Sequence, residues 1–111
     1  MNCKSYLLPM LLGCFLTASQ TYATDRTNAQ LIKRIQYNGA AQTLFFVGES
    51  KWSSENCASA TYIQIRSTEV PGIKEIMSIG LAAQMAGKDV EFWGACDSNP
   101  DYFNANYIVI E

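Results

Sequence analysis

The sequence has no histidine and few charged residues, which make up 16 % of its 111 positions. Histidine is the most common general base in enzymes and a frequent zinc ligand, so its absence removes the usual acid–base and metal chemistries. Glycine-rich phosphate-binding loops, internal repeats and low-complexity tracts are also missing. These absences predict a protein that is not an enzyme and that needs no cofactor and no metal.

Hydrophobic residues, 49 % of the chain, are concentrated at its start, where Lys4 precedes an apolar run over residues 6–18. This order is typical of a secretory signal peptide, and we expect cleavage after Ala23. The domains predicted are therefore a signal peptide over residues 1–23 and one small domain over residues 24–111, exported to the periplasm or secreted. An alternative is that the tetrapeptide ending at Cys14 is a lipobox, which would make the protein a lipoprotein anchored through Cys14. The apolar residues directly after Cys14 argue against that alternative.

The predicted domain is mildly acidic, because seven basic and ten acidic residues follow position 23 and leave a net charge of −3. Electrostatic binding of nucleic acid is therefore not expected. No apolar run in this part approaches the roughly 20 residues that cross a bilayer, so no membrane span is expected.

Two cysteines, Cys57 and Cys96, lie in the predicted domain. Disulfides persist in exported proteins, and two cysteines allow one connectivity. Closing a loop of about 40 residues stabilises a chain by roughly 4 kcal/mol in the chain-entropy model. The alternative is a pair of unpaired buried thiols; a metal site is disfavoured because no second cysteine lies near either one.

The strongest local signal is a hairpin formed by strands over residues 30–37 and 41–47. The Asn38-Gly39 dipeptide between them suits a type I′ turn and sets Tyr37 opposite Ala40. Both faces of this hairpin carry apolar residues, so part of the second face needs a helix, a neighbouring strand or another subunit to cover it.

After this hairpin, residues 48–59 are expected to form a polar loop, whereas residues 24–28 are expected to be loose or to form a short cap. A third strand is expected over residues 60–66, a fourth over 89–95 and a fifth over 106–110, with a turn-rich loop over 96–103. A helix is expected to begin after a cap at Ser67 or Thr68, with Pro71 in its first turn, and to end at Gly87. The order β-β-β-α-β-β is the connectivity of the OB-fold, a partly open barrel of five strands with one helix, so we expect an α+β, OB-fold-like barrel with one disulfide.

The predicted helix has two apolar surfaces on a wheel of 100° per residue. One is broad and includes Gly80 and Ala83, so it can approach a sheet closely. The other is a stripe of Met77, Leu81 and Met85 within an otherwise polar arc. A single domain buries one helix face, so this stripe predicts an oligomer interface; the alternatives are that a loop covers it or that it is simply exposed.

Two segments, residues 72–96 and residues 107–110, resemble a family of short, functionally uncharacterised exported proteins of Gram-negative bacteria. The first segment includes the run Gly87-Lys88-Asp89-Val90, followed by an aromatic strand and Cys96. More remotely, the layout is similar to the B subunits of the A-plus-pentameric-B bacterial toxins. The toxin resemblance implies an oligomer whose helices line a central pore and a surface that binds sugars. One departure is that the first cysteine of those toxin subunits lies near the mature N-terminus, whereas Cys57 precedes the third strand.

Loop aromatic residues with nearby amide and carboxylate groups are typical of a shallow sugar site, because rings cover the C–H face while polar side chains bind the hydroxyls. The alternative is a structural role, in which Trp93 and Phe103 belong to the core of the barrel and Trp52 covers one of its open ends. Asp97 and Asp101 could form a glycosidase pair, but acidic residues in an Asn-Pro turn are more often solvated. Glu49 and Glu55 lack calcium-ligand spacing. The candidate ligand residues are Trp52, Trp93, Asn99, Asp101, Tyr102 and Asn104.

Two functions are therefore predicted from the sequence. The first is a non-enzymatic, oligomeric binding module, similar to a toxin B subunit, that recognises cell-surface glycans. The second is a periplasmic interaction or inhibitor protein whose helix stripe docks on a different protein. The partners expected are a second copy of the chain, and either a glycan or a partner protein.

Overall fold

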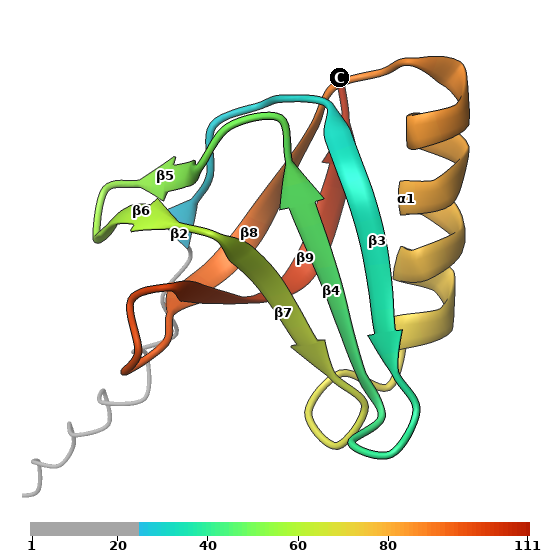
Figure 1. Cartoon of the computed structure of the whole chain (residues 1–111), viewed down its shortest axis with the longest axis horizontal. Helices are drawn as coiled ribbons and strands as arrows, with labels where there is room; N and C mark the ends of the chain where they lie inside the picture. Colours follow the sequence, from blue (N-terminus) through green and yellow to red (C-terminus); the bar gives the residue numbers. More distant parts are fainter. Residues whose placement is uncertain (1–24) are drawn as a thin grey trace, which may run out of the picture.

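The computed structural model describes residues 25–111; the predicted signal peptide and Cys14 lie outside them. The described residues form one helix and a set of strands (Figure 1). Their bounds are β2 Asp25–Arg26, β3 Ile32–Asn38, β4 Thr43–Gly48, β5 Trp52–Ser54, β6 Cys57–Ala60, β7 Tyr62–Arg66, α1 Ile73–Ala86, β8 Val90–Cys96 and β9 Tyr102–Ile110.

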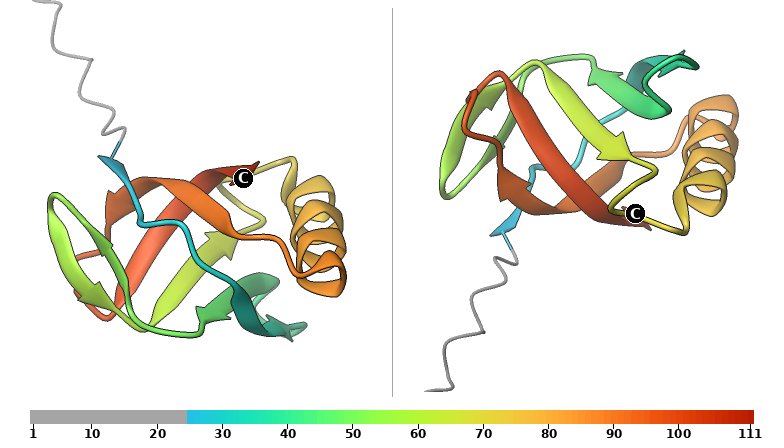
Figure 2. Two further views of the ribbon diagram at one scale, coloured as in Figure 1. Left: turned by 90° about the horizontal axis from the view of Figure 1, so that it is seen from above. Right: turned by 90° about the horizontal axis from the view of Figure 1, so that it is seen from below.

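Six strands form one curled sheet in the order β2-β8-β9-β7-β4-β3, and β5 pairs with β6 in a separate hairpin (Figure 2). All neighbours are antiparallel except β7 and β9, which are parallel. The segment from β2 to β3 runs along both edges of the sheet, because its first part pairs with β8 and its second part pairs with β4. No ladder joins β2 to β3 within residues 25–111, so the sheet is not a closed barrel.

The α+β class, the helix after the third predicted strand and the disulfide are confirmed, but the expected number of strands is wrong. The start that was expected to be loose forms β2, and the expected polar loop contains the β5–β6 hairpin. A residue of β2 stabilises this hairpin, since the Asp25 carboxylate accepts hydrogen bonds from the Ser54 hydroxyl and the Asn56 N–H. Such support from a distant segment has no local sequence signal.

The turn of the β3–β4 hairpin also differs from the prediction. Asn38 pairs with Thr43, so the loop has four residues rather than two and Tyr37 lies opposite Leu44 instead of Ala40. The Asn38 side chain accepts hydrogen bonds from the N–H groups of Ala40 and Ala41 at 3.1 Å each, and Gln42 takes the positive φ of 53°. An asparagine that bonds its own backbone stabilises this longer turn as well as a type I′ turn.

Helix α1 ends as predicted, with Gly87 in the left-handed conformation at φ 66°. Its start is not capped by Ser67 or Thr68; Gly72 takes that position without a side-chain cap, and the Ser67 hydroxyl donates to Gln42 instead. The face containing Gly80 and Ala83 is buried against the sheet, as expected. A side chain at position 80 would overlap the ring of Phe46, so the helix approaches β4 as closely as glycine permits.

The core lies between the concave side of the sheet and α1, with the β5–β6 hairpin covering the other end (Figures 1 and 2). Phe92 contacts two aromatic neighbours there, Phe46 at 4.9 Å and Trp52 at 5.3 Å between ring centroids. The predicted Cys57–Cys96 disulfide is present and joins the hairpin to the end of β8. It therefore adds a covalent link to a short element that is otherwise held in the core by Trp52 and Ala60.

Candidate functional site

The convex side of the sheet carries a cluster of large side chains over β4, β7 and β9. Residues alternate along these strands, so Leu44, Phe46, Ile63 and Ile65 point into the core while their neighbours point outward. The ladders place Phe45 beside Gln64, and the parallel pairing places Tyr62 beside Tyr102 and Gln64 beside Asn104. Side chains from three strands therefore form one continuous outer face.

Three aromatic rings form the first part of this face. Tyr62 and Tyr102 stack with centroids 5.3 Å apart and planes 18° from parallel, and Phe45 contacts the Tyr62 ring edgewise at 5.7 Å. All three are half-buried, so part of each ring remains open to solvent. We call Phe45, Tyr62 and Tyr102 the aromatic cluster.

A row of hydrogen-bonded polar groups continues the face beside the aromatic cluster. The Gln64 amide donates to Asn104 Oδ1 at 2.9 Å, and the Asn104 amide donates to Asp97 Oδ1 at 2.8 Å. Arg66 lies 3.9 Å from the same carboxylate oxygen. These four side chains, the amide row, are held by one another, and Gln64 is 8 % exposed. The groups are therefore oriented before any ligand arrives.

The electrostatics of the amide row are centred on Asp97. The hydrogen bond from Asn104 lowers the pKa of Asp97 below its ordinary value, and the backbone N–H of Asn99 and the Arg66 cation act in the same direction. The carboxylate is thus kept ionised and accepting. A hollow of about 110 Å³ lies beside the row, lined by Gln64, Arg66, Glu69, Val70, Asn104, Ala105 and Asn106.

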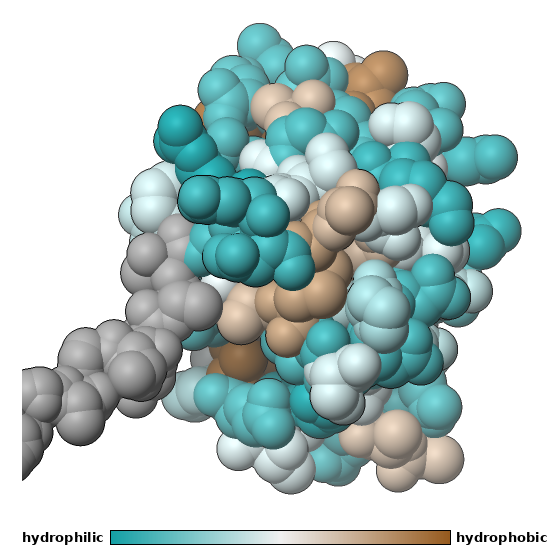
Figure 3. All heavy atoms as spheres, turned by 90° about the vertical axis from the view of Figure 1, so that its left-hand side faces the viewer, coloured by the Kyte–Doolittle hydropathy of each residue, from teal (hydrophilic) through white to brown (hydrophobic). Residues whose placement is uncertain are grey.

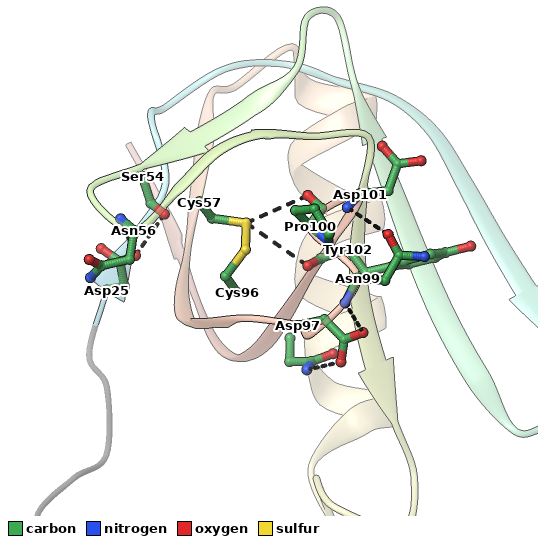
Figure 4. The surroundings of a disulfide bond; sticks show 11 residues. Asp25, Ser54, Asn56, Cys57, Cys96, Asp97, Asn99, Pro100, Asp101 and Tyr102 are labelled. Carbon is green, nitrogen blue, oxygen red and sulfur yellow. Dashed lines mark hydrogen bonds between the residues drawn. A yellow bond between two sulfur atoms is a disulfide. The ribbon is translucent and has the colours of Figure 1, made fainter.

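The loop of residues 97–101 borders this face and is fastened at several points (Figure 4). Asn99 Oδ1 accepts from the Asp101 N–H, and the Asp101 carboxylate accepts from the Thr61 hydroxyl at 2.9 Å. Lys51 donates to that same hydroxyl. The disulfide lies directly behind the loop, with Cys57 Sγ 3.8 Å from the carbonyl oxygen of Pro100. The end of the molecule that presents this loop is mostly polar around a small apolar area (Figure 3).

The structure brings together four of the six candidate ligand residues predicted from the sequence. Tyr102 belongs to the aromatic cluster and Asn104 to the amide row, while Asn99 and Asp101 are exposed in the bordering loop. Trp52 is not with them: its side chain is 0 % exposed and packs on Phe92. Its indole N–H has no hydrogen-bond partner among the described residues.

Trp93 lies on another part of the convex side, beside β2. Its indole N–H donates to Glu91 at 2.9 Å, its ring meets Tyr107 edgewise at 5.6 Å, and the Arg26 guanidinium lies 5.6 Å from its centroid. Trp93 is thus part of a separate cluster, while Phe103, suggested as core, is 1 % exposed.

Sequence reasoning missed Phe45, Tyr62, Gln64 and Arg66. A signal for Phe45 was present, because the predicted hairpin had apolar residues on both faces and one face lacked a partner. The other three belong to β7, and for Tyr62 and Gln64 the decisive fact is the parallel pairing of that strand with β9, some 40 positions later in the chain.

The predicted oligomer interface is exposed in the structure. Met77, Leu81 and Met85 are 36 %, 47 % and 79 % exposed, and no loop of the described residues covers them. This excludes the covering loop as the explanation for the stripe within this part of the chain.

Within residues 25–111 no cluster of acidic, cysteine or histidine side chains has the size of a metal site. A search of the same residues for a helix of membrane-spanning length and hydropathy returns none. Comparison with known proteins adds no relative: the chain matches no protein-family model, no curated protein and no solved structure.

Proposed function

We propose that the protein is an exported, non-enzymatic module that binds a carbohydrate on the convex face of β4, β7 and β9. The observation that carries the proposal is the position of the aromatic cluster directly beside the pre-oriented amide row. Aromatic rings attract the C–H face of a sugar, and fixed amide, carboxylate and guanidinium groups bind its hydroxyls.

The hydrogen-bond capacities of the amide row support this assignment. Asp97 is an acceptor, Arg66 is a donor, and the two amides offer both functions, so the row can address neighbouring hydroxyls that each donate and accept. Because the Asp97–Asn104 and Asn104–Gln64 bonds already fix the side chains, binding loses little side-chain entropy. Shallow recognition of this kind suits a glycan displayed on a surface.

An OB-fold-like arrangement supports the same face as the binding surface. We infer this arrangement from three features: a helix between β7 and β8, the parallel β7–β9 pair, and a first segment that pairs with β8 and then with β4. In this reading β4 and β7 are the second and third barrel strands, whose outer face and adjoining loops bind oligosaccharides in that fold. The resemblance to toxin B subunits and the predicted export lead to the same proposal.

The test is a glycan array probed with the purified chain, its disulfide intact, followed by titration of the best glycan. We expect Tyr102→Ala to weaken binding at least 10-fold, equivalent to about 1.4 kcal/mol, because the stack with Tyr62 is lost. Tyr102→Phe separates the ring from its hydroxyl and is expected to retain binding. Tyr37→Ala removes an exposed tyrosine, 52 % accessible, from the edge strand and serves as the matched control.

Two results would refute carbohydrate binding at this face. One is an array without any bound glycan, and the other is a glycan that Tyr102→Ala binds as tightly as the wild type. Melting curves of each variant show that any loss is not caused by unfolding.

A further inference from the structure

A groove lies between α1 and the edge strand β3, and the proposed carbohydrate site does not use it. It consists of two adjoining hollows of about 450 and 340 Å³, which share Met77 in their walls. The larger hollow is lined by residues of β3 and of α1 between Met77 and Gln84, and the smaller continues toward the β3–β4 turn and the start of α1.

The groove has an apolar interior and a basic rim. Ile35, Ile73, Met77 and Leu81 supply the apolar surface, whereas Lys33, Arg34 and Lys74 are its charged residues and no acidic residue lines either hollow. The ion pairs among residues 25–111 involve Arg26 and Arg66, so these three cations have no salt-bridge partner there. In a domain with a net charge of −3, such a rim attracts negatively charged partners.

The backbone of β3 is the second unusual feature of the groove. β3 ends the sheet and pairs with β4 on one side only. On the other side, the Gln84 amide of α1 donates to the carbonyl oxygens of Ile32 and Lys33 at 3.4 and 3.2 Å. These bonds show that backbone carbonyl groups of β3 face the helix. At the start of the strand they accept hydrogen bonds from the Gln84 side chain. A free strand edge is a template for another strand.

We propose that this groove binds an extended, acidic peptide segment of another protein, which adds to the sheet as a strand along β3. Main-chain hydrogen bonds to the edge give such a complex its affinity, and alternate side chains give it specificity. Apolar side chains of the peptide contact Met77 and Leu81, and its acidic side chains face Lys33, Arg34 and Lys74.

Charge favours this occupant over a second copy of the chain. In a two-fold contact through this groove both copies contribute the same surface, so the basic rim of one copy would lie close to the basic rim of the other. An acidic strand from a different protein instead neutralises all three cations. This proposal is independent of carbohydrate binding, and Tyr102→Ala is expected to leave it unchanged.

The probe is a fluorescein-labelled octapeptide of alternating Glu and Val, with a Lys–Val peptide of equal length for comparison. We expect the acidic peptide to raise fluorescence anisotropy on titration, with affinity falling as salt is added, and the basic peptide not to bind. Reversing two rim charges, Lys33→Glu with Arg34→Glu, is expected to weaken binding at least 10-fold. Lys88→Glu, a charge reversal at an exposed lysine that lines neither hollow, is the matched control.

Hydrogen exchange distinguishes strand addition from contact through side chains alone, since amides of β3 must exchange more slowly when the peptide is bound. The proposal is overturned if the acidic peptide does not bind, if the basic peptide binds equally well, or if the double variant binds like the wild type. It is also overturned if sedimentation shows a dimer or larger ring that Leu81→Glu dissociates and that excludes the peptide, because a second copy then occupies the groove.

Discussion

Replacing Gly80 by alanine tests how closely α1 packs on the sheet. An added Cβ would overlap the Phe46 ring, which is 0 % exposed and is itself packed against Phe92 with centroids 4.9 Å apart. The ring is therefore enclosed, and displacing it disturbs its contact with Phe92. Overpacking of this kind costs about 1–3 kcal/mol.

Helix propensity acts in the opposite direction, because alanine is favoured over glycine by about 1 kcal/mol in a helix interior. Because the added Cβ would overlap two atoms of an enclosed ring, the overpacking cost lies in the upper part of that range, at about 2–3 kcal/mol. Subtracting the propensity gain, we expect Gly80→Ala to lower the free energy of unfolding by about 1–2 kcal/mol. For a domain of this size each kcal/mol lowers Tm by about 4–8 °C, so the expected loss of Tm is about 5–15 °C.

Thermal and urea unfolding, followed by circular dichroism, measure this change. Ser78→Ala, an exposed position on the same helix, is the control and is expected to be neutral or slightly stabilising. In a double-mutant cycle with Phe46→Leu, the Gly80→Ala penalty should shrink, because the smaller side chain makes room. An unchanged or raised Tm for Gly80→Ala would refute the close packing of α1 on β4.

Two further predictions concern stability. Cys57→Ser or Cys96→Ser should each lower the free energy of unfolding by several kcal/mol, since the bridge spans 39 positions; a melting temperature that reduction leaves unchanged would contradict this. Because the pKa of Asp97 is lowered in the folded chain, its stabilising effect is complete above its unfolded pKa and is lost as the pH falls through its folded pKa. Unfolding measured between about pH 5 and pH 2 should therefore show a smaller loss of stability in Asp97→Asn than in the wild type; parallel pH profiles would show that the hydrogen bonds to Asp97 do not form.

Several elements could be predicted because their signals are local. The helix was recognised from its apolar spacing and from Gly87, whose positive φ ends it. The third and fourth strands were found within a few residues of β7 and β8, because β-branched and aromatic residues are concentrated there. The disulfide followed from there being two cysteines in a chain expected to be exported.

The errors at β9 and at Trp52 share one cause, which is support from distant parts of the chain. β9 begins at Tyr102 rather than at residue 106, because pairing with β7 extends it through an asparagine-containing stretch. Trp52 sits in a polar segment that suggested exposure, yet the hairpin turns its ring onto Phe92 in the core. The polar residues next to Trp52 in the sequence therefore did not predict the apolar surroundings of its ring in the folded chain.

The residue pattern alone predicts the class of fold, the position of the helix, the disulfide partners and the surplus apolar stripe at Met77, Leu81 and Met85. These depend on residue type and periodicity within a short window. The folded chain, in contrast, is needed to see that Tyr62 stacks on Tyr102 and that Gln64 bonds to Asn104, two contacts that each span 40 positions. It likewise placed the unpaired edge of β3 beside α1. Which strands pair depends on contacts between distant parts of the chain, here the curvature of the sheet and the packing of the helix on it. No single segment of the chain therefore encodes the pairing.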